Sequence, residues 1–300
     1  MPPNLRAVSR YNAGWFVVEA KLLMPSLELR PLSVAAQENF HAANIGACRW
    51  GDRLIAMVRT VNWVIKDALS YEIRGGDTAW KSRLLLLELD RDLRVTSSAG
   101  VDPPEDLPQL KYHIDIGFAD PRPFGWRGEV WFVSTFRQLN TQGLSEIVIS
   151  RVSRARPNGY VMCDWHVVPS RMQPQHEKNW MPQVVGDELR LIDPTRVLTD
   201  SGAIVHNEPA AIAAENFRGG SQAVPFDEGW LAIIHEVEHV NRQRRYCHRF
   251  IWMDSGNTLR RLSRRFYLKK LGVEFVAGMA WHRRSQNAPR RIPRPPPAKG

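Results

Sequence analysis

Cysteine is scarce in this chain, and the three that occur, Cys48, Cys163 and Cys247, are odd in number and widely spaced. This pattern is typical of reduced thiols and does not indicate a disulfide framework or a zinc knuckle. Long hydrophobic runs are also lacking, since no apolar stretch approaches the roughly 18 residues of a membrane span. The first 24 residues have no signal-peptide apolar region. We therefore expect a cytoplasmic protein without a membrane partner.

Helical periodicity is nearly missing, and short candidates occur only near 33–40 and 209–217. Short apolar runs rich in β-branched and aromatic residues, divided by Gly, Pro, Asp and Asn, predict strands instead. More than ten strands and few helices favour a propeller or a sandwich, although no sharp repeat of known type is present. The predicted strands span 53–58, 83–89, 129–136, 145–152, 165–169, 188–192, 203–206, 229–235, 246–253, 259–266 and 273–277.

Acidic residues are missing from the last 20 positions, which carry six Arg or Lys residues and five prolines. The whole chain has a formal net charge of +10. This composition predicts a disordered Arg/Pro-rich tail over 281–300. A basic tail raises the alternative of nucleic-acid binding, which deletion of the tail would test through its salt dependence. We expect a solvated tail and no nucleic-acid partner.

The segment from His235 to His239 satisfies the H-E-x-x-H pattern of zinc peptidases. That chemistry requires a helix, so that both histidines share one face. The preceding Gly-Trp-Leu-Ala-Ile-Ile run instead predicts a strand, in which the two histidines would lie about 13 Å apart. We therefore predict no metal site and no cofactor.

Polar clusters recur beside the predicted strands, and the firmest is Asp120-Pro121-Arg122, where two prolines stiffen the chain around an acid and a guanidinium. A propeller gathers the inner ends of its blades at one axial funnel, so scattered clusters would converge there. Hydroxyl-binding charges with interleaved aromatic rings suit a sugar. The candidate binding residues are Asn44, Arg59, Arg122, Lys178, Asn179, Arg218, His235, Tyr246, His248 and Arg249.

Several segments come in an order that resembles glycoside hydrolase family 130, the β-mannoside phosphorylases and related hydrolases. They are Asp120-Pro-Arg, Glu177-Lys-Asn-Trp-Met-Pro, Arg218-Gly-Gly-Ser-Gln, Trp230 to His235, Tyr246 to Phe250 and Val273 to Gly278. The resemblance is nearest to a branch found beside or fused to glycosyltransferases, and it implies a glycosyltransferase as a partner. It also implies a five-bladed β-propeller over 36–280, with an N-terminal segment over 1–35 that either joins the propeller or precedes it.

The resemblance implies cleavage of an oligosaccharide or glycoside with inversion, Asp120 being the proton donor through a sugar hydroxyl. In a phosphorylase, inorganic phosphate is the co-substrate, and Lys178 and His235 are the candidates to hold it, with Arg59, Arg218 and Arg249 as further cationic groups. In a hydrolase a carboxylate must activate water, about 6.5–9.5 Å from the acid. The candidates for that base are Glu177, Glu208 and Glu236.

The chain also departs from the family. Ala119 precedes Asp120 where characterised phosphorylases have Glu, and Lys178 has a different sequence setting. A Gly-x-x-Asp motif normally follows the Glu-Phe-x-x-Gly segment, and here the Arg/Pro tail takes its place, so we expect another form of closure or a shortened copy. These departures leave open an alternative, a carbohydrate-binding propeller that has lost its chemistry.

Overall fold

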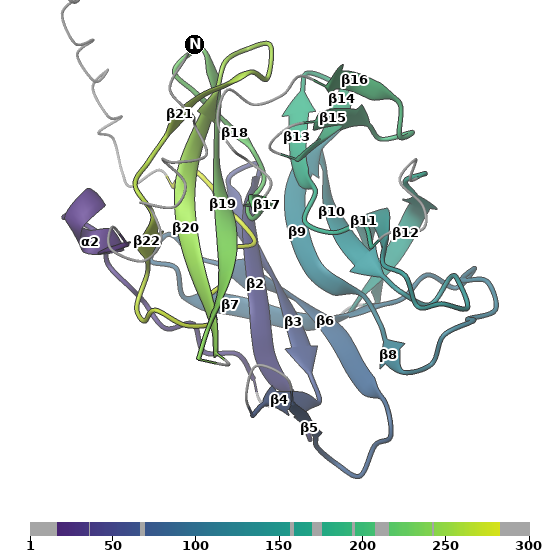
Figure 1. Ribbon diagram of the computed structural model, residues 1–300. Helices are drawn as coiled ribbons and strands as arrows, with labels where there is room; N and C mark the ends of the chain where they lie inside the picture. The colour runs from purple at the N-terminus through teal and green to yellow at the C-terminus, as the bar shows by residue number, and fades with distance from the viewer. Residues whose placement is uncertain are drawn as a thin grey trace, which may run out of the picture.

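Four blades of mostly antiparallel strands are arranged around a common axis in the computed structural model (Figure 1). The structure describes residues 17–282, apart from 36, 67–69, 157–158, 170–175, 194–195, 208–215 and 242. Within these residues the secondary structure is almost entirely strand, the one helix being α2 (Ala20–Leu23). None of the described helices is long and apolar enough to cross a membrane.

The first two blades share one nine-stranded sheet, because their outermost strands, β7 and β12, pair in parallel. Blade 1 consists of β2 (His41–Trp50), β3 (Arg53–Val61), β6 (Trp80–Leu89) and β7 (Val95–Asp102). Blade 2 consists of β9 (Ala119–Trp126), β10 (Glu129–Phe136), β11 (Glu146–Arg156) and β12 (Gly159–Val167). The short β8 (Asp115–Ile116) pairs with the start of β6, and β4 (Trp63–Ile65) with β5 (Tyr71–Ile73) forms a separate hairpin.

The other two blades are separate sheets. Blade 3 consists of β13 (Met181–Val185), β14 (Glu188–Asp193), β15 (Arg196–Thr199) and β16 (Ile204–Asn207). Blade 4 is built on the long pair β19 (Gly229–Val240) and β20 (Gln243–Met253). Its shorter strands are β17 (Arg218–Gly219), β18 (Val224–Phe226), β21 (Leu259–Leu262), β22 (Phe266–Tyr267) and β1 (Val18–Glu19).

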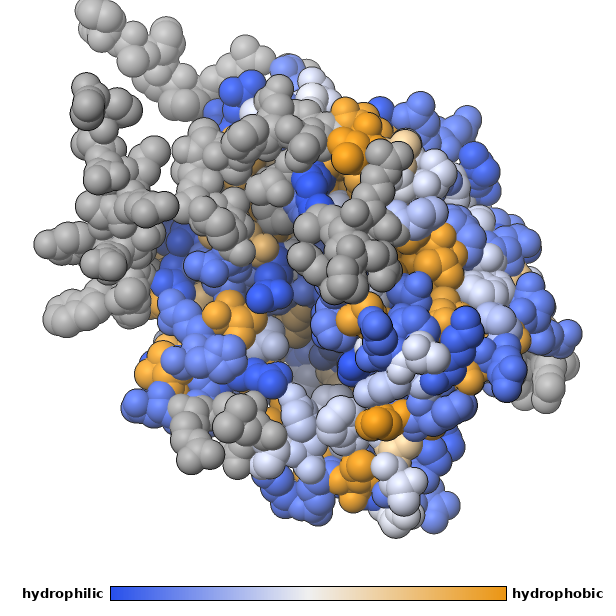
Figure 2. Space-filling view, turned by 45° about the vertical axis from the view of Figure 1, so that its right-hand side comes forward, coloured by the Kyte–Doolittle hydropathy of each residue, from blue (hydrophilic) through white to orange (hydrophobic). Residues whose placement is uncertain are grey.

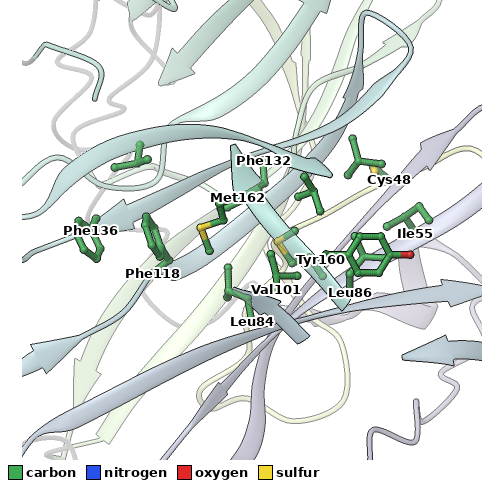
Figure 3. Packing of buried hydrophobic residues seen from close by; sticks show 14 residues of the cluster. Cys48, Ile55, Leu84, Leu86, Val101, Phe118, Phe132, Phe136, Tyr160 and Met162 are labelled. Atoms are coloured by element: carbon green, nitrogen blue, oxygen red, sulfur yellow. The ribbon is translucent and has the colours of Figure 1, made fainter. Parts of the chain in front are cut away.

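Strand periodicity places apolar side chains on both faces of each blade. In β3, Ile55 and Met57 enter the core between blades 1 and 2, whereas Ala56 and Val58 face the other way. Figure 3 shows the first of these cores, where Ile55, Leu84 and Leu86 of blade 1 meet Phe132 and Met162 of blade 2. Equivalent clusters join blade 2 to blade 3 and blade 3 to blade 4. Successive side chains point to opposite faces of a strand, so each blade can pack apolar side chains against both of its neighbours.

The two ends of the described chain contact both blade 1 and blade 4. Leu32 and Val34 cover the free face of blade 1. The C-terminal segment 273–281 passes between β2 and residues 218–222, as the yellow trace of Figure 1 indicates. Gln222 fixes this segment: its Nε2 donates to Ala47 O at 2.8 Å and Met279 O at 2.5 Å, and its Oε1 accepts from Met279 N at 2.9 Å.

The predicted fold class, an all-β propeller, is confirmed, with four blades and the two ends of the described chain between blades 4 and 1. Two local predictions are wrong. The stretch 33–40 is not a helix, because residues 37 and 40 form a bridge around a turn in which Asn39 has a positive φ. The stretch 273–277 is not a strand, because it forms no ladder with a neighbouring strand.

The outer surface is mostly hydrophilic on the face drawn in Figure 2, with scattered hydrophobic spots and a hollow near its middle. The second predicted helix, 209–217, and the disordered tail, 281–300, fall largely outside the described residues. Trp281, assigned to that tail, instead stacks on Phe226 with ring centroids 5.8 Å apart.

Candidate active site

Two β-bulges shape the centre of the site. The register of β2 against β3 shifts between Ala42 and Ile45, opposite Arg59, and places Asn44 in the bulge. The register of β9 against β10 shifts between Val133 and Thr135, which places Asp120 in a second bulge with a φ of 52°. A bulge redirects a side chain away from the alternation of its strand. Both bulges therefore aim polar groups toward each other.

Asp120 lies on blade 2 but is bound by blade 1. Asn44 Nδ2 and Arg59 Nη1 both donate to its Oδ1, the second at 3.2 Å. The carboxylate side chain keeps 26% of its surface exposed. Burial raises its pKa, but the charges of Arg59, Arg122 and Lys178 and the hydrogen bond from Asn44 outweigh burial and lower the pKa overall. Asp120 is therefore a carboxylate at neutral pH in the unliganded protein.

Arg122 is fully buried and connects three blades. Its Nε donates to Gly220 O at 2.6 Å, and Nη2 donates to Gly219 O at 3.2 Å and Asn179 Oδ1 at 3.0 Å. Nη1 donates to the carbonyl of Asp120 at 3.1 Å. Burial lowers its pKa to about 10, and the charge of Asp120 opposes this shift. Arg122 and Asn179 thus organise the site, and their predicted contact with a ligand stays a prediction.

Two cations of the site have side chains without a partner. Lys178 and Arg218 are exposed, and within the described part of the chain neither side chain forms a hydrogen bond or an ion pair. The charge of Lys178 acts on Asp120, and that of Arg218 acts on Lys178 and His235. Burial and the charge of Arg137 lower the pKa of Lys178, whereas Asp120 and Asp115 raise it. The arrangement leaves an excess of positive charge around one carboxylate.

His235 is buried beneath an aromatic layer. Its ring stacks on Tyr246 at 5.4 Å and meets Phe275 edge to face at 5.1 Å. Burial lowers its pKa to about 3, helped by the charges of Arg122, His248 and Arg218. The imidazole is therefore neutral at pH 7 and offers an anion one N–H, not a charge. Its Nδ1 has no hydrogen-bond partner among the described residues.

Two residues that were predicted to contact a ligand, His248 and Arg249, do not face Asp120. His248 pairs with His235 across β19 and β20 but is completely buried and lies against Phe266. Arg249 points to the opposite face of the sheet, where its Nε donates to Glu236 Oε1 at 2.5 Å. Adjacent residues of a strand point to opposite faces, so Tyr246 and Arg249 cannot both face Asp120.

The site also contains residues that are not among the predicted binding residues. Arg137 donates to Asp115 Oδ2 at 3.1 Å, and the charges of both act on Lys178. The Phe275 ring centre lies 5.3 Å from the Arg122 guanidinium carbon, and the same ring meets His235 edge to face. Asp115 stands only five residues before Asp120 and could have been included on that ground. Phe275 gave no such signal, because its position depends on how the ring closes.

Two of the three candidate bases for hydrolysis are engaged elsewhere. Glu177 accepts from Trp180 Nε1 at 2.7 Å, at an apolar pocket between blades 2 and 3. Glu236 lies on the far face of blade 4, paired with Arg249 and Arg265. Glu208 lies outside the described residues. The strand predicted for the His235–His239 motif is confirmed, since all five residues belong to β19.

Comparison with solved structures supports the fold. The β-1,2-mannobiose phosphorylase from Listeria innocua, in complex with β-1,2-mannobiose, has a TM-score of 0.51 and 10% identity, over 82% of this chain and 85% of that one. The mannose phosphorylase MPT-4 from Leishmania mexicana, in complex with phosphate, has a TM-score of 0.48 and 13% identity, over 82% and 75%. A β-1,3-galactosidase of family GH43, in complex with galactodeoxynojirimycin, has a TM-score of 0.44 and 11% identity, over 81% of each chain.

These likenesses have a limited reach. At 10% identity the first one shows the β-propeller fold alone, and the other two fall below a TM-score of 0.5 and carry no argument. No model of a known protein family matches the sequence, and no curated protein matches it significantly. The class that fold and site define is therefore an all-β propeller with a cationic axial site around one carboxylate.

Proposed function

We propose that this protein is a carbohydrate-active propeller that cleaves a β-linked mannoside, or a similar glycoside, by phosphorolysis with inversion. The observation that carries the proposal is Asp120, set between Asn44 and Arg59 in a site where two cations, Lys178 and Arg218, have side chains without a partner among the described residues. The fold shared with a mannobiose phosphorylase agrees with it.

Phosphate has a place to bind in this scheme. Lys178 supplies a point charge and Arg218 a guanidinium that can form two parallel hydrogen bonds to phosphate oxygens. Neutral His235 adds at most one N–H donor, so the two exposed cations carry most of the binding. A phosphate oxygen then attacks the anomeric carbon, while the bond from that carbon to the glycosidic oxygen breaks on the opposite face of the ring.

The leaving oxygen needs a proton, which Asp120 supplies through a sugar hydroxyl. In the unliganded site the pKa of Asp120 is too low for it to hold this proton. Bound phosphate offsets the positive charges of Lys178, Arg218 and Arg59 and so raises the pKa of Asp120. Phosphate binding therefore favours the protonated form of Asp120, which the reaction requires. Turnover should fall as the pH rises through the pKa of Asp120 in the complex.

Phosphate is favoured over water as the attacking group. A hydrolase needs a second carboxylate to activate water across the ring. Of the candidate bases that the structure describes, Glu177 is bound to Trp180 and Glu236 faces away from the site, so neither of these two serves as that base. Association with a glycosyltransferase stays a prediction.

The lowered pKa of Asp120 also favours a second function, carbohydrate binding without chemistry. A permanently ionised carboxylate paired with Arg59 is a good acceptor for sugar hydroxyls and a poor acid. The two functions differ in whether phosphate converts binding into turnover.

The deciding experiment compares wild type with Asp120→Asn on β-mannosides and β-glucosides, with and without inorganic phosphate. Sugar 1-phosphate and free sugar are measured separately. We expect phosphate-dependent sugar 1-phosphate from wild type, and a loss of at least 10³-fold in Asp120→Asn with sugar binding kept, because amide nitrogen cannot replace the acid.

Exposed Asp187→Asn, in the turn between β13 and β14, is the matched control and should be fully active. Free sugar without phosphate would identify a hydrolase. Binding without any product would contradict the enzyme and leave the binding protein.

A further inference from the structure

A wall of aromatic side chains borders the site on the side of blade 1. Trp63 of β4 and Tyr71 of β5 meet edge to face, with ring centroids 5.1 Å apart. Tyr71 also lies 5.5 Å from Trp80, the first residue of β6. All three side chains are partly exposed. Ring surface on this hairpin therefore remains open to a ligand.

Arg59 connects the wall with Asp120. Its Nη1 donates to the carboxylate, and its guanidinium carbon lies 5.7 Å from the centre of the Trp63 ring. Its Nε donates to Ser82 Oγ at 2.9 Å, which fixes the side chain between the two. The wall therefore begins one side chain away from the proposed proton donor.

A second connection comes from blade 4. The guanidinium carbon of Arg244 lies 5.9 Å from the centre of the Tyr71 ring, and Tyr246 stacks on His235 at the bottom of the site. Burial raises the pKa of Tyr246, Arg244 lowers it, and Asp120 and Tyr71 raise it further. Tyr246 thus lies near both the carboxylate and the aromatic wall. The wall therefore contacts residues of blade 1 and of blade 4 that border the site.

The chemistry of this surface matches a pyranose ring. Trp63 and Tyr71 present apolar ring surface, which packs against the C–H face of a sugar. Arg59 and Arg244 stand at its two ends and can donate to ring hydroxyls. Inorganic phosphate does not pack against aromatic faces, so the wall is not an extension of the phosphate site.

We propose that Trp63 and Tyr71 form a subsite for the second sugar ring of the substrate, the ring that leaves when the bond beside Asp120 breaks. The inference rests on the proposed function and narrows it. The substrate is a disaccharide or a longer chain, of which the protein recognises two rings. The β4–β5 hairpin therefore selects such a substrate over a glycoside with a single sugar ring.

The test measures binding of β-1,2-mannobiose, mannose and inorganic phosphate by titration calorimetry to Trp63→Ala and Tyr71→Ala. We expect each variant to bind the disaccharide at least tenfold more weakly, and mannose and phosphate as wild type does. Saturation-transfer NMR should lose the signal from the C–H protons of one ring only. Trp63→Phe and Tyr71→Phe keep an aromatic face and should recover most of the affinity.

Trp165→Ala is the matched control, because this partly exposed tryptophan of blade 2 bonds to Asp106 outside the site. Tyr71→Leu keeps apolar volume and replaces the alanine variant if that one does not fold. Unchanged disaccharide binding, or an equal loss for mannose and mannobiose, would overturn the subsite while wild-type turnover still upheld the proposed function. A wild type that neither binds nor cleaves any β-linked disaccharide would overturn both.

Discussion

At the scale of single residues, the site combines an acid that is held ionised with a histidine that is held neutral. Burial is the largest cause of the lowered pKa of His235, whereas at Asp120 the charges of Arg59, Arg122 and Lys178 outweigh burial. The charge of Arg122 lowers the pKa of both groups. For an acid this stabilises the charged form, whereas for a base it stabilises the uncharged form. Each of the two shifts makes folding sensitive to acid.

His235 allows a quantitative prediction. Its pKa is about 3 in the folded protein and about 6.5 in the unfolded chain. Between these values the unfolded chain binds more protons, so the free energy of unfolding decreases as the pH falls. Between pH 7 and pH 5 we expect His235 to account for a loss of about 2 kcal/mol.

Denaturant unfolding of wild type and His235→Gln at both pH values measures this contribution. The glutamine variant should lack that part of the pH dependence, and exposed His113→Gln should retain it. Identical pH dependence in wild type and His235→Gln would contradict the assignment.

At the scale of elements, the closing segment depends on Gln222. Its amide satisfies one carbonyl of β2 and both backbone groups of Met279, at a position where no strand pairs with the segment. Replacement by alanine leaves these groups without partners and should cost about 2–4 kcal/mol of unfolding free energy. Hydrogen exchange at the Met279 amide should also become faster.

Exposed Gln243→Ala, in the hairpin of blade 4, should change neither quantity. Unchanged exchange at Met279 in Gln222→Ala would show that packing, and not the amide, holds the segment.

The elements also show what the sequence could and could not predict. Short runs of β-branched and aromatic residues such as Val130 to Val133 predicted β10 and the strand class, because such a composition is a local property of the sequence. The strand is buried on both faces. The resemblance placed Asp120 and Lys178 in one site. The sequence did not predict that Asn44 and Asp120 sit in bulges, or that 273–277 is no strand. The bulges depend on how each strand pairs with its neighbour in the sheet. The path of 273–277 depends on β2 and residues 218–222, which lie more than 50 positions away in the chain.

At the scale of the whole molecule, Arg122 is the main polar connection across the axis. Its four hydrogen bonds reach β9, the entry to blade 3 and the start of blade 4, and the side chain is only 1% exposed. Arg122→Lys keeps the charge but cannot reproduce the planar fork. The carbonyls of Gly219 and Gly220 would then lie buried without donors.

We expect Arg122→Lys to lose about 3 kcal/mol of unfolding free energy and to loosen the contact between blades 2 and 4. Urea unfolding measures the loss, with exposed Arg91→Lys as the control. A variant as stable as wild type would mean that the apolar cores alone hold the ring together.

Asp120 belongs to one blade, and both donors to its carboxylate belong to the blade beside it. The pKa of Asp120 therefore depends on the distance between blades 1 and 2. A shift of a few tenths of an ångström between the blades changes the Coulomb energy of the pair and with it the proton affinity. The carboxylate stretching frequency of Asp120, followed under hydrostatic pressure, would therefore report changes in the distance between these two blades.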